Sequence, residues 1–185
     1  RERMKPIDPL MTEHGLIDQM IKLARDETLK IATKDELRPA FIDTFVDFLR
    51  TYADDTHHGK EEDILFRELE GKDLSAEDRQ LMEELMDEHV YARETVGELV
   101  AAKDAYLQGD EEALETVVRT LAELIELYPE HIRKEDDVFF PASMTYLSDA
   151  EQDAMIEEMW EADRQMIHQK YQSVVQRLQD ERLGI

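Results

Sequence analysis

Residues 57–66 read HHGKEEDILF, and residues 131–140 read HIRKEDDVFF. Both segments follow one pattern, His-x-x-Lys-Glu-acid-acid-aliphatic-x-Phe. On an α-helix a residue and its fourth successor differ by about 400° of rotation and about 6 Å of rise. The histidine and the glutamate of each segment therefore point to the same side of a helix, where they can enter one small volume. The acids that follow lie about 100° further round and are expected to be solvated; they are Glu62, Asp63, Asp136 and Asp137.

The rest of the chain repeats its apolar residues at spacings of three and four, which is typical of helices. Only six glycines and five prolines interrupt this spacing. Capping-box patterns begin at Ser75 and Ser148, and Gly71 and Gly109 are stop signals. The pattern predicts five long helices at about 8–32, 35–70, 76–107, 111–140 and 148–182. Their short connections indicate antiparallel neighbours, and so an all-α up-down four-helix bundle with an additional C-terminal helix.

We interpret residues 1–185 as a single domain, with the bundle at about 8–146 and the extra helix at about 148–182. Gly59 is a mild breaker inside the second helix, costing about 1 kcal/mol relative to alanine, so a local irregularity is expected there. Pro129 is expected to kink or split the fourth helix, because it removes a backbone donor. The stripe of Met155, Met159 and Met166, with Trp160 nearby, is interpreted as packing groups that cover the bundle or form a homodimer contact.

The charge of the chain restricts its partners. It carries 46 Asp plus Glu against 22 Lys plus Arg, a formal net charge of −24. Such a chain repels nucleic acids and anionic membranes unless it has a basic patch, and no such patch is visible. No run approaches the roughly 18 apolar residues of a membrane span, and no signal-peptide core follows the polar start. Zero cysteines exclude thiolate chemistry and suit a reducing cytosol, so we expect a cytoplasmic protein.

The histidines point to a metal. The chain has six: His14, His57, His58, His89, His131 and His168. The first five lie on the first four predicted helices, at positions that antiparallel packing brings to a shared level. Several imidazoles and two glutamates in an apolar core would cost several kcal/mol each without compensation. A bound cation removes that cost, so we infer a metal site.

The number of ligands favours two metal ions. Five imidazoles and two carboxylates exceed the four ligands of a tetrahedral zinc, whereas two metals bridged by Glu61 and Glu135 would use them all. The Glu-x-x-His pattern of ferritin-type di-iron proteins is absent. Imidazole suits iron, zinc, copper and nickel, so ligand type alone leaves the metal open.

Three segments together resemble hemerythrin-like domains of the HHE cation-binding type. They are YADDTHHGKEEDILF at 52–66, Glu88-His89-x-x-x-Arg93, and His131-Ile132-x-Lys134-Glu135-Asp136-x-x-Phe139-Phe140-Pro141. The resemblance covers roughly Leu10 to Pro141. It implies a bundle around a non-haem di-iron centre, with two iron ions bridged by two carboxylates and an oxo or hydroxo group. It also implies an open position for dioxygen or another small diatomic or peroxide ligand.

Carried over to this sequence, the resemblance implies seven metal ligands: His14, His57, His58, Glu61, His89, His131 and Glu135. His14 and His57 would bind one iron, His89 and His131 the other, and the two glutamates would bridge. Arg93 stands where oxygen-carrying hemerythrins have a second histidine on the third helix, and His58 is expected to replace it. Glu135 follows its histidine by four residues, where those proteins have aspartate at five. His168 matches no ligand position and is expected to be a surface or packing residue.

Three functions remain open from sequence. The favoured one is a di-iron protein that binds dioxygen as an oxygen- or redox-responsive binder, an oxygen carrier or an iron reservoir, because no catalytic group is visible apart from the metal site. The second is an enzyme that turns over peroxide, dioxygen or nitric oxide. It would need a proton donor such as Tyr128, which lies near the face of His131; Tyr52 is less well placed. The third is a structural zinc or manganese bundle without redox chemistry.

Overall fold

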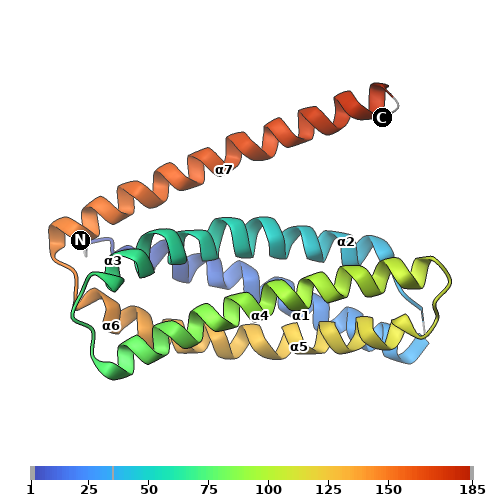
Figure 1. The fold of residues 1–185 in the computed structure, drawn as a ribbon, viewed down its shortest axis with the longest axis horizontal. Helices are drawn as coiled ribbons and strands as arrows, with labels where there is room; N and C mark the ends of the chain where they lie inside the picture. Colours follow the sequence, from blue (N-terminus) through green and yellow to red (C-terminus); the bar gives the residue numbers. More distant parts are fainter. Residues whose placement is uncertain (1–2, 35, 184–185) are drawn as a thin grey trace.

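The helices run up and down along one long axis, and the last of them leaves the others (Figure 1). The computed structural model describes residues 3–34 and 36–183, and from residue 167 onward the only side chain described is that of Lys170. The first helix is α1 (Ile7–Lys34), and the third is α4 (Ala76–Leu107). The second consists of α2 (Pro39–Asp47), η1 (Phe48–His58), η2 (Glu61–Phe66) and α3 (Arg67–Glu70). The fourth consists of α5 (Ala113–Lys134), η3 (Glu135–Phe139) and α6 (Phe140–Met144), and α7 (Asp149–Leu183) follows.

The predicted four-helix bundle is confirmed. Helix α5 packs against α4 and α1, and α2 and η1 pack against α4. Buried apolar side chains form two clusters, one with Ile17, Phe45 and Leu121 and the other with Leu10 and Phe139. On each of the four helices the predicted ligands fall between residues of the first cluster and residues of the second. The site therefore lies inside the bundle, between two apolar layers.

Two predicted helix boundaries were wrong, both at prolines. The second helix begins at Pro39 instead of near residue 35, and Arg38 before it is extended (φ −103°, ψ 91°). The residue before a proline disfavours the α conformation, and proline suits the first helical turn. The fourth helix continues past Pro141 to Met144, and Pro129 does not split it. A π-helical stretch precedes α6, and Pro141 lies in the first turn of α6, where a proline is tolerated.

The irregularity expected at Gly59 is present but much longer. The stretches η1, η2 and η3 are π-helical and contain or adjoin most of the predicted ligands. A Cβ added to Gly59 would lie 3.7 Å from the Asp54 carbonyl oxygen, an ordinary contact, so the lack of a side chain does not explain the widened turns. π-Helical turns are frequent at functional sites, which agrees with their position here.

Helix α7 covers the bundle with its first half. Ser148 and Glu151 form the predicted capping box, with Ser148 N–H donating to Glu151 Oε2 at 2.8 Å. Met155 and Met159 are buried against the second apolar cluster, so this part of the methionine stripe covers the bundle. Trp160 does not pack on the bundle, because its side chain is exposed in the single chain, and the alternative of a homodimer contact stays a prediction. Further along, α7 diverges from the bundle (Figure 1), and the side chain of His168 lies outside the described residues.

Among the described residues, none of the helices combines the length and the apolar character that a membrane crossing requires.

Candidate metal centre

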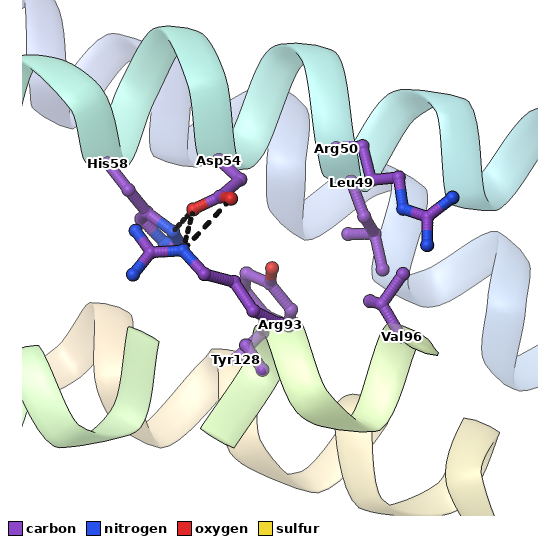
Figure 2. Close-up of a pocket in the computed structure, with 8 residues that line it drawn as sticks. Leu49, Arg50, Asp54, His58, Arg93, Val96 and Tyr128 are labelled. Atoms are coloured by element: carbon purple, nitrogen blue, oxygen red, sulfur yellow. Dashed lines mark hydrogen bonds and ion pairs between the residues drawn. The ribbon is translucent and has the colours of Figure 1, made fainter. Parts of the chain in front are cut away.

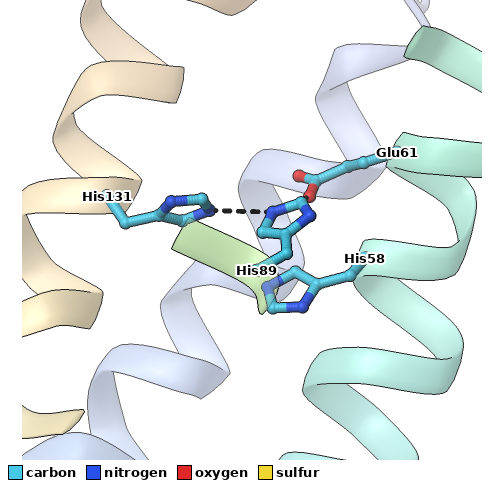
Figure 3. A group of neighbouring side chains, drawn as sticks. All are labelled: His58, Glu61, His89 and His131. Carbon is cyan, nitrogen blue, oxygen red and sulfur yellow. Dashed lines mark hydrogen bonds and ion pairs between the residues drawn. The ribbon is translucent and has the colours of Figure 1, made fainter. Parts of the chain in front are cut away.

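All seven predicted ligands are buried and come together at one level of the bundle. They form two groups that share Glu61, and the candidate ligand atoms of each group lie within 4.8 Å of one another. Figure 3 shows the group drawn from the second helix, α4 and α5, with its side chains converging from three helices. The two groups are His14, His57, Glu61 and Glu135, and His58, Glu61, His89 and His131.

Each of the two glutamates reaches both groups of histidines. Glu61 Oε1 lies 3.0 Å from His57 Nε2, and its Oε2 lies 3.3 Å from His89 Nε2. Glu135 Oε2 lies 3.0 Å from His14 Nε2, and its Oε1 lies 3.2 Å from His131 Nε2. Each carboxylate thus presents one oxygen to each half of the site, which is the arrangement that a carboxylate bridge between two cations needs.

A second layer of carboxylates orients the five imidazoles. Every Nδ1 atom of these five lies within hydrogen-bond distance of a carboxylate oxygen, and every Nε2 atom except that of His58 lies within 3.3 Å of another predicted ligand. The Nδ1 partners are Asp136 for His14 (2.7 Å), Glu13 for His57 (3.1 Å), Asp54 for His58 (3.1 Å), Glu62 for His89 (2.6 Å) and Glu88 for His131 (2.7 Å). An Nδ1–H that donates to a carboxylate leaves the Nε2 lone pair free to bind a metal.

The solvated state predicted for Glu62 and Asp136 was therefore wrong, whereas Asp63 and Asp137 are exposed as predicted. Glu62 and Asp136 each follow a bridging-type glutamate by one residue. This places them at the edge of the helix, where they meet the histidine of a neighbouring helix. The chain has 46 acidic residues, so the sequence alone does not distinguish the carboxylates of this layer from the others. The detectable signal was an acid directly before each histidine in Glu13-His14 and Glu88-His89.

Lysine and arginine side chains form a third layer, in which they pair with those carboxylates. This pairing gives a role to the lysine that both repeated segments contain. Lys60 pairs with Glu13, the partner of His57, and Lys134 pairs with Glu88, the partner of His131. In both segments the lysine thus holds the carboxylate that orients the histidine three residues before it. Arg93 plays a similar part, because its guanidinium donates to Asp54 at 2.8 Å and to Glu62 at 2.7 Å.

When the imidazoles are neutral and keep their Nδ1–H, as metal binding requires, the inner atoms place acceptors against acceptors. His14 Nε2 and His57 Nε2 lie 2.9 Å apart, and His89 Nε2 and His131 Nε2 lie 3.1 Å apart. In that state none of the four carboxylate oxygens of Glu61 and Glu135 has a hydrogen-bond donor among the described residues. Buried acceptors without donors are costly, and a cation among them offsets that cost. Nitrogen and oxygen donors in this number fit a metal of borderline or hard character.

The groups packed around the histidines also shift the pKa values of their imidazoles. Burial alone would lower the pKa of His57, but the negative charge of Glu61 and the hydrogen bond to Glu13 raise it to about 10. His131 likewise has its pKa raised to about 10 by Glu135 and Glu88 against the effect of burial. His58 differs, because burial and the neighbouring His89 hold its pKa well below its usual value.

The fold and the site define a helical bundle that offers buried imidazole and carboxylate groups to cations. The model of the Hemerythrin HHE cation binding domain matches residues 5–143, and a second match covers residues 80–183. The chain belongs to this hemerythrin HHE cation-binding family. Among curated proteins it is similar to uncharacterized proteins of Mycobacterium bovis and Mycobacterium tuberculosis. Each is 25% identical over 174 residues, which is 94% of this chain and 67% of the relative. No solved structure matches significantly.

Proposed function

We propose that the seven buried side chains bind two iron ions and that this centre binds dioxygen or a related small ligand. The observation that carries the proposal is the reach of Glu61 and Glu135, since each presents one buried oxygen to each of the two groups of histidines. One ion would be held by His14 and His57, and the other by three imidazoles. The bound metals would supply reversible electron exchange with a diatomic or peroxide ligand.

The two halves are unequal, and this favours binding of an exogenous ligand at one of them. His58 adds a third imidazole to the group of His89 and His131, whereas its counterpart in the second segment is Ile132. The half with His14 and His57 thus has one nitrogen fewer. A metal site with fewer protein ligands retains a position for a small molecule, as in catalytic zinc sites compared with structural ones. We propose an oxygen- or redox-responsive binder or an iron reservoir.

The test is metal analysis and optical spectroscopy of protein purified in air. We expect two iron ions per chain and a spectrum that changes reversibly between the reduced, deoxygenated protein and the air-exposed protein. His131→Ala should lose most bound iron, whereas Glu130→Gln, an exposed neighbour, should keep it. Zinc alone after expression with all metals supplied, or full iron in His131→Ala, would contradict the proposal.

Metal affinity should rise with pH up to about 10. His57 and His131 have pKa values of about 10 in the metal-free site and so hold protons at neutral pH. Each must lose its proton to ligate a metal while it keeps its Nδ1–H, so the metal-free form binds more protons than the loaded form. Raising the pH therefore increases the metal affinity, by up to about a hundredfold per pH unit when two protons are released. Calorimetry in buffers of different ionisation enthalpy measures this release; no released protons at neutral pH would contradict it.

One observation favours the second candidate, an enzyme that turns over peroxide. A pocket of about 210 Å³ is lined by residues that include His58, Asp54, Arg93 and Tyr128. Figure 2 shows the Tyr128 ring beside Arg93, with its hydroxyl oxygen directed toward the helix that carries Asp54. The ring is buried, lies with its centroid 6.3 Å from that of His58, and burial raises the pKa of the hydroxyl, which therefore stays protonated. A protonated hydroxyl thus lies beside the half of the site that contains His58, and the enzyme candidate requires peroxide to bind at that half.

If the protein is a peroxide-consuming enzyme, Tyr128→Phe should lower turnover by about a hundredfold or more, because a positioned general acid contributes that much. Iron content and the optical spectrum should stay as in the wild type, since Tyr128 is not among the predicted ligands. Peroxide consumption by stopped-flow measurement tests this. Equal turnover in Tyr128→Phe and wild type would show that the tyrosine takes no part in catalysis. If neither protein consumes peroxide, the enzyme candidate is excluded and the proposed ligand-binding function remains.

A further inference from the structure

Helix α7 is held to the bundle by several ion pairs, and one of them differs from the rest. Arg67 pairs with Glu158 at 2.8 Å, and both side chains are about half exposed. Lys60, by contrast, is 3% exposed and lies 2.8 Å from Asp163. The Asp163 side chain is 38% exposed as a whole, but its Oδ1 is buried, and among the described residues the contact of this oxygen is the ion pair with Lys60.

The other partner of Lys60 connects this ion pair with the metal centre. Lys60 also binds Glu13, whose second oxygen faces His57 Nδ1 at 3.1 Å. A continuous chain of contacts therefore runs from Asp163 on α7 through Lys60 and Glu13 to His57. The exposed pair of Arg67 and Glu158 also fastens α7 to the second long helix, but among the described residues these two bind each other and neither hydrogen-bonds to a predicted ligand or to the carboxylate partner of one.

The opposite half of the site has the same chain of contacts without α7. Lys134, the counterpart of Lys60, pairs with Glu84 and Glu88, and both of these lie on α4. The support of His131 is thus complete within the four-helix bundle. The support of His57 takes one of its carboxylates from the additional helix.

We propose that Asp163 is a positioning residue for the metal held by His14 and His57, so that this half of the centre depends on the docking of α7. The inference rests on the proposed two-metal function and deepens it. Without Asp163 the buried ammonium of Lys60 keeps a single carboxylate partner and turns toward solvent. Glu13 follows it and no longer orients His57. Carboxylates that orient metal-ligating histidines change metal affinity by about 10- to 100-fold when removed.

The coupling acts in both directions. If docked α7 strengthens metal binding at this half, metal binding there strengthens the docking of α7 by the same factor. The loaded protein should therefore hold the last docked turns of α7 more firmly than the metal-free protein. The metal bound by His58, His89 and His131 should be indifferent to α7.

The experiment compares two full-length variants, Asp163→Asn and Glu158→Gln, each of which removes one charge from α7. Both are loaded with iron(II) without oxygen, and a chelator in excess removes the metal. We expect Asp163→Asn to release one of its two ions about tenfold faster than the wild type and the other at the wild-type rate. Glu158→Gln should release both as the wild type does. Equal rates in Asp163→Asn and wild type, or equal acceleration in both variants, would overturn the inference.

Hydrogen exchange gives a second readout that does not depend on release rates. Backbone amides of residues 155–166 should exchange more slowly in loaded than in metal-free wild type, and this difference should vanish in Asp163→Asn. The same exchange with and without metal in the wild type would overturn the coupling while leaving the two-metal site intact. Wild-type protein that binds no metal at all would overturn the proposed function together with this inference.

Discussion

Replacing Glu61 by glutamine should remove metal from both halves of the centre, the largest loss expected of any single substitution. Glu61 belongs to both groups of predicted ligands, with an oxygen 3.0 Å from His57 and another 3.3 Å from His89. Glutamine keeps the size of the side chain but removes the charge that holds two cations together. Iron content should fall from two ions per chain to nearly none.

Thermal unfolding with and without iron(II) gives an independent measure. In the wild type, ligand at about 100 times its Kd adds about 2.7 kcal/mol to the free energy of unfolding. Glu61→Gln should gain almost nothing. The matched control is Asp63→Asn, two residues further on, whose side chain is exposed and which should retain the metal. Full occupancy in Glu61→Gln would exclude Glu61 as a bridge.

Replacing Phe140 by alanine should lower both stability and metal occupancy. Phe140 is fully buried, and its ring stacks on that of His14 with the centroids 5.6 Å apart and the planes within 2°. Removing a buried phenylalanine side chain costs about 3–5 kcal/mol in the free energy of unfolding. The plane of the His14 imidazole loses one of its supports at the same time, so the metal at that half should bind less tightly.

Phe45→Ala is the control for this prediction. Phe45 is equally buried but belongs to the other apolar cluster, away from the ligands. It should lose about as much stability in urea unfolding while the folded fraction keeps its full metal content. If both variants keep equal metal per folded chain, the stacked ring of Phe140 has no role in holding His14.

Much of the inner site could be predicted because the positions of its residues follow from spacings within single helices. The four-residue spacing from His57 to Glu61 and from His131 to Glu135 places each pair on one face of a helix, whatever lies around it. The position of His14 and His89 followed from the order of antiparallel helices. The capping residues Ser75 and Ser148 likewise act within one turn, and both were predicted correctly.

What the sequence did not reveal depends on contacts between distant segments. The roles of Glu13 and Asp136 become clear only when α1 lies beside the second and fourth helices, because their partners are 44 and 122 residues away. The rule that a proline ends a helix is local, and it predicts an end before Pro141. The fourth helix instead continues past this residue, after a π-helical turn that the rule does not take into account. The ion pair of Lys60 with Asp163 requires the docked position of α7, which no spacing rule provides.

The contacts of the centre close a ring through all four helices of the bundle. His14 of α1 meets Asp136 and Glu135 of the fourth helix, and His131 of the fourth meets Glu88 of α4. His89 of α4 meets Glu62 of the second helix, and His57 of the second meets Glu13 of α1.

No adjacent pair of these helices contains a complete set of ligands for both positions. A chain in which one helix has detached could not hold both of the proposed ions, so only the fully assembled bundle would gain the free energy of binding them. Loading should therefore slow global unfolding more than local fraying. In a cell it would protect from proteases only those copies of the protein that have finished folding.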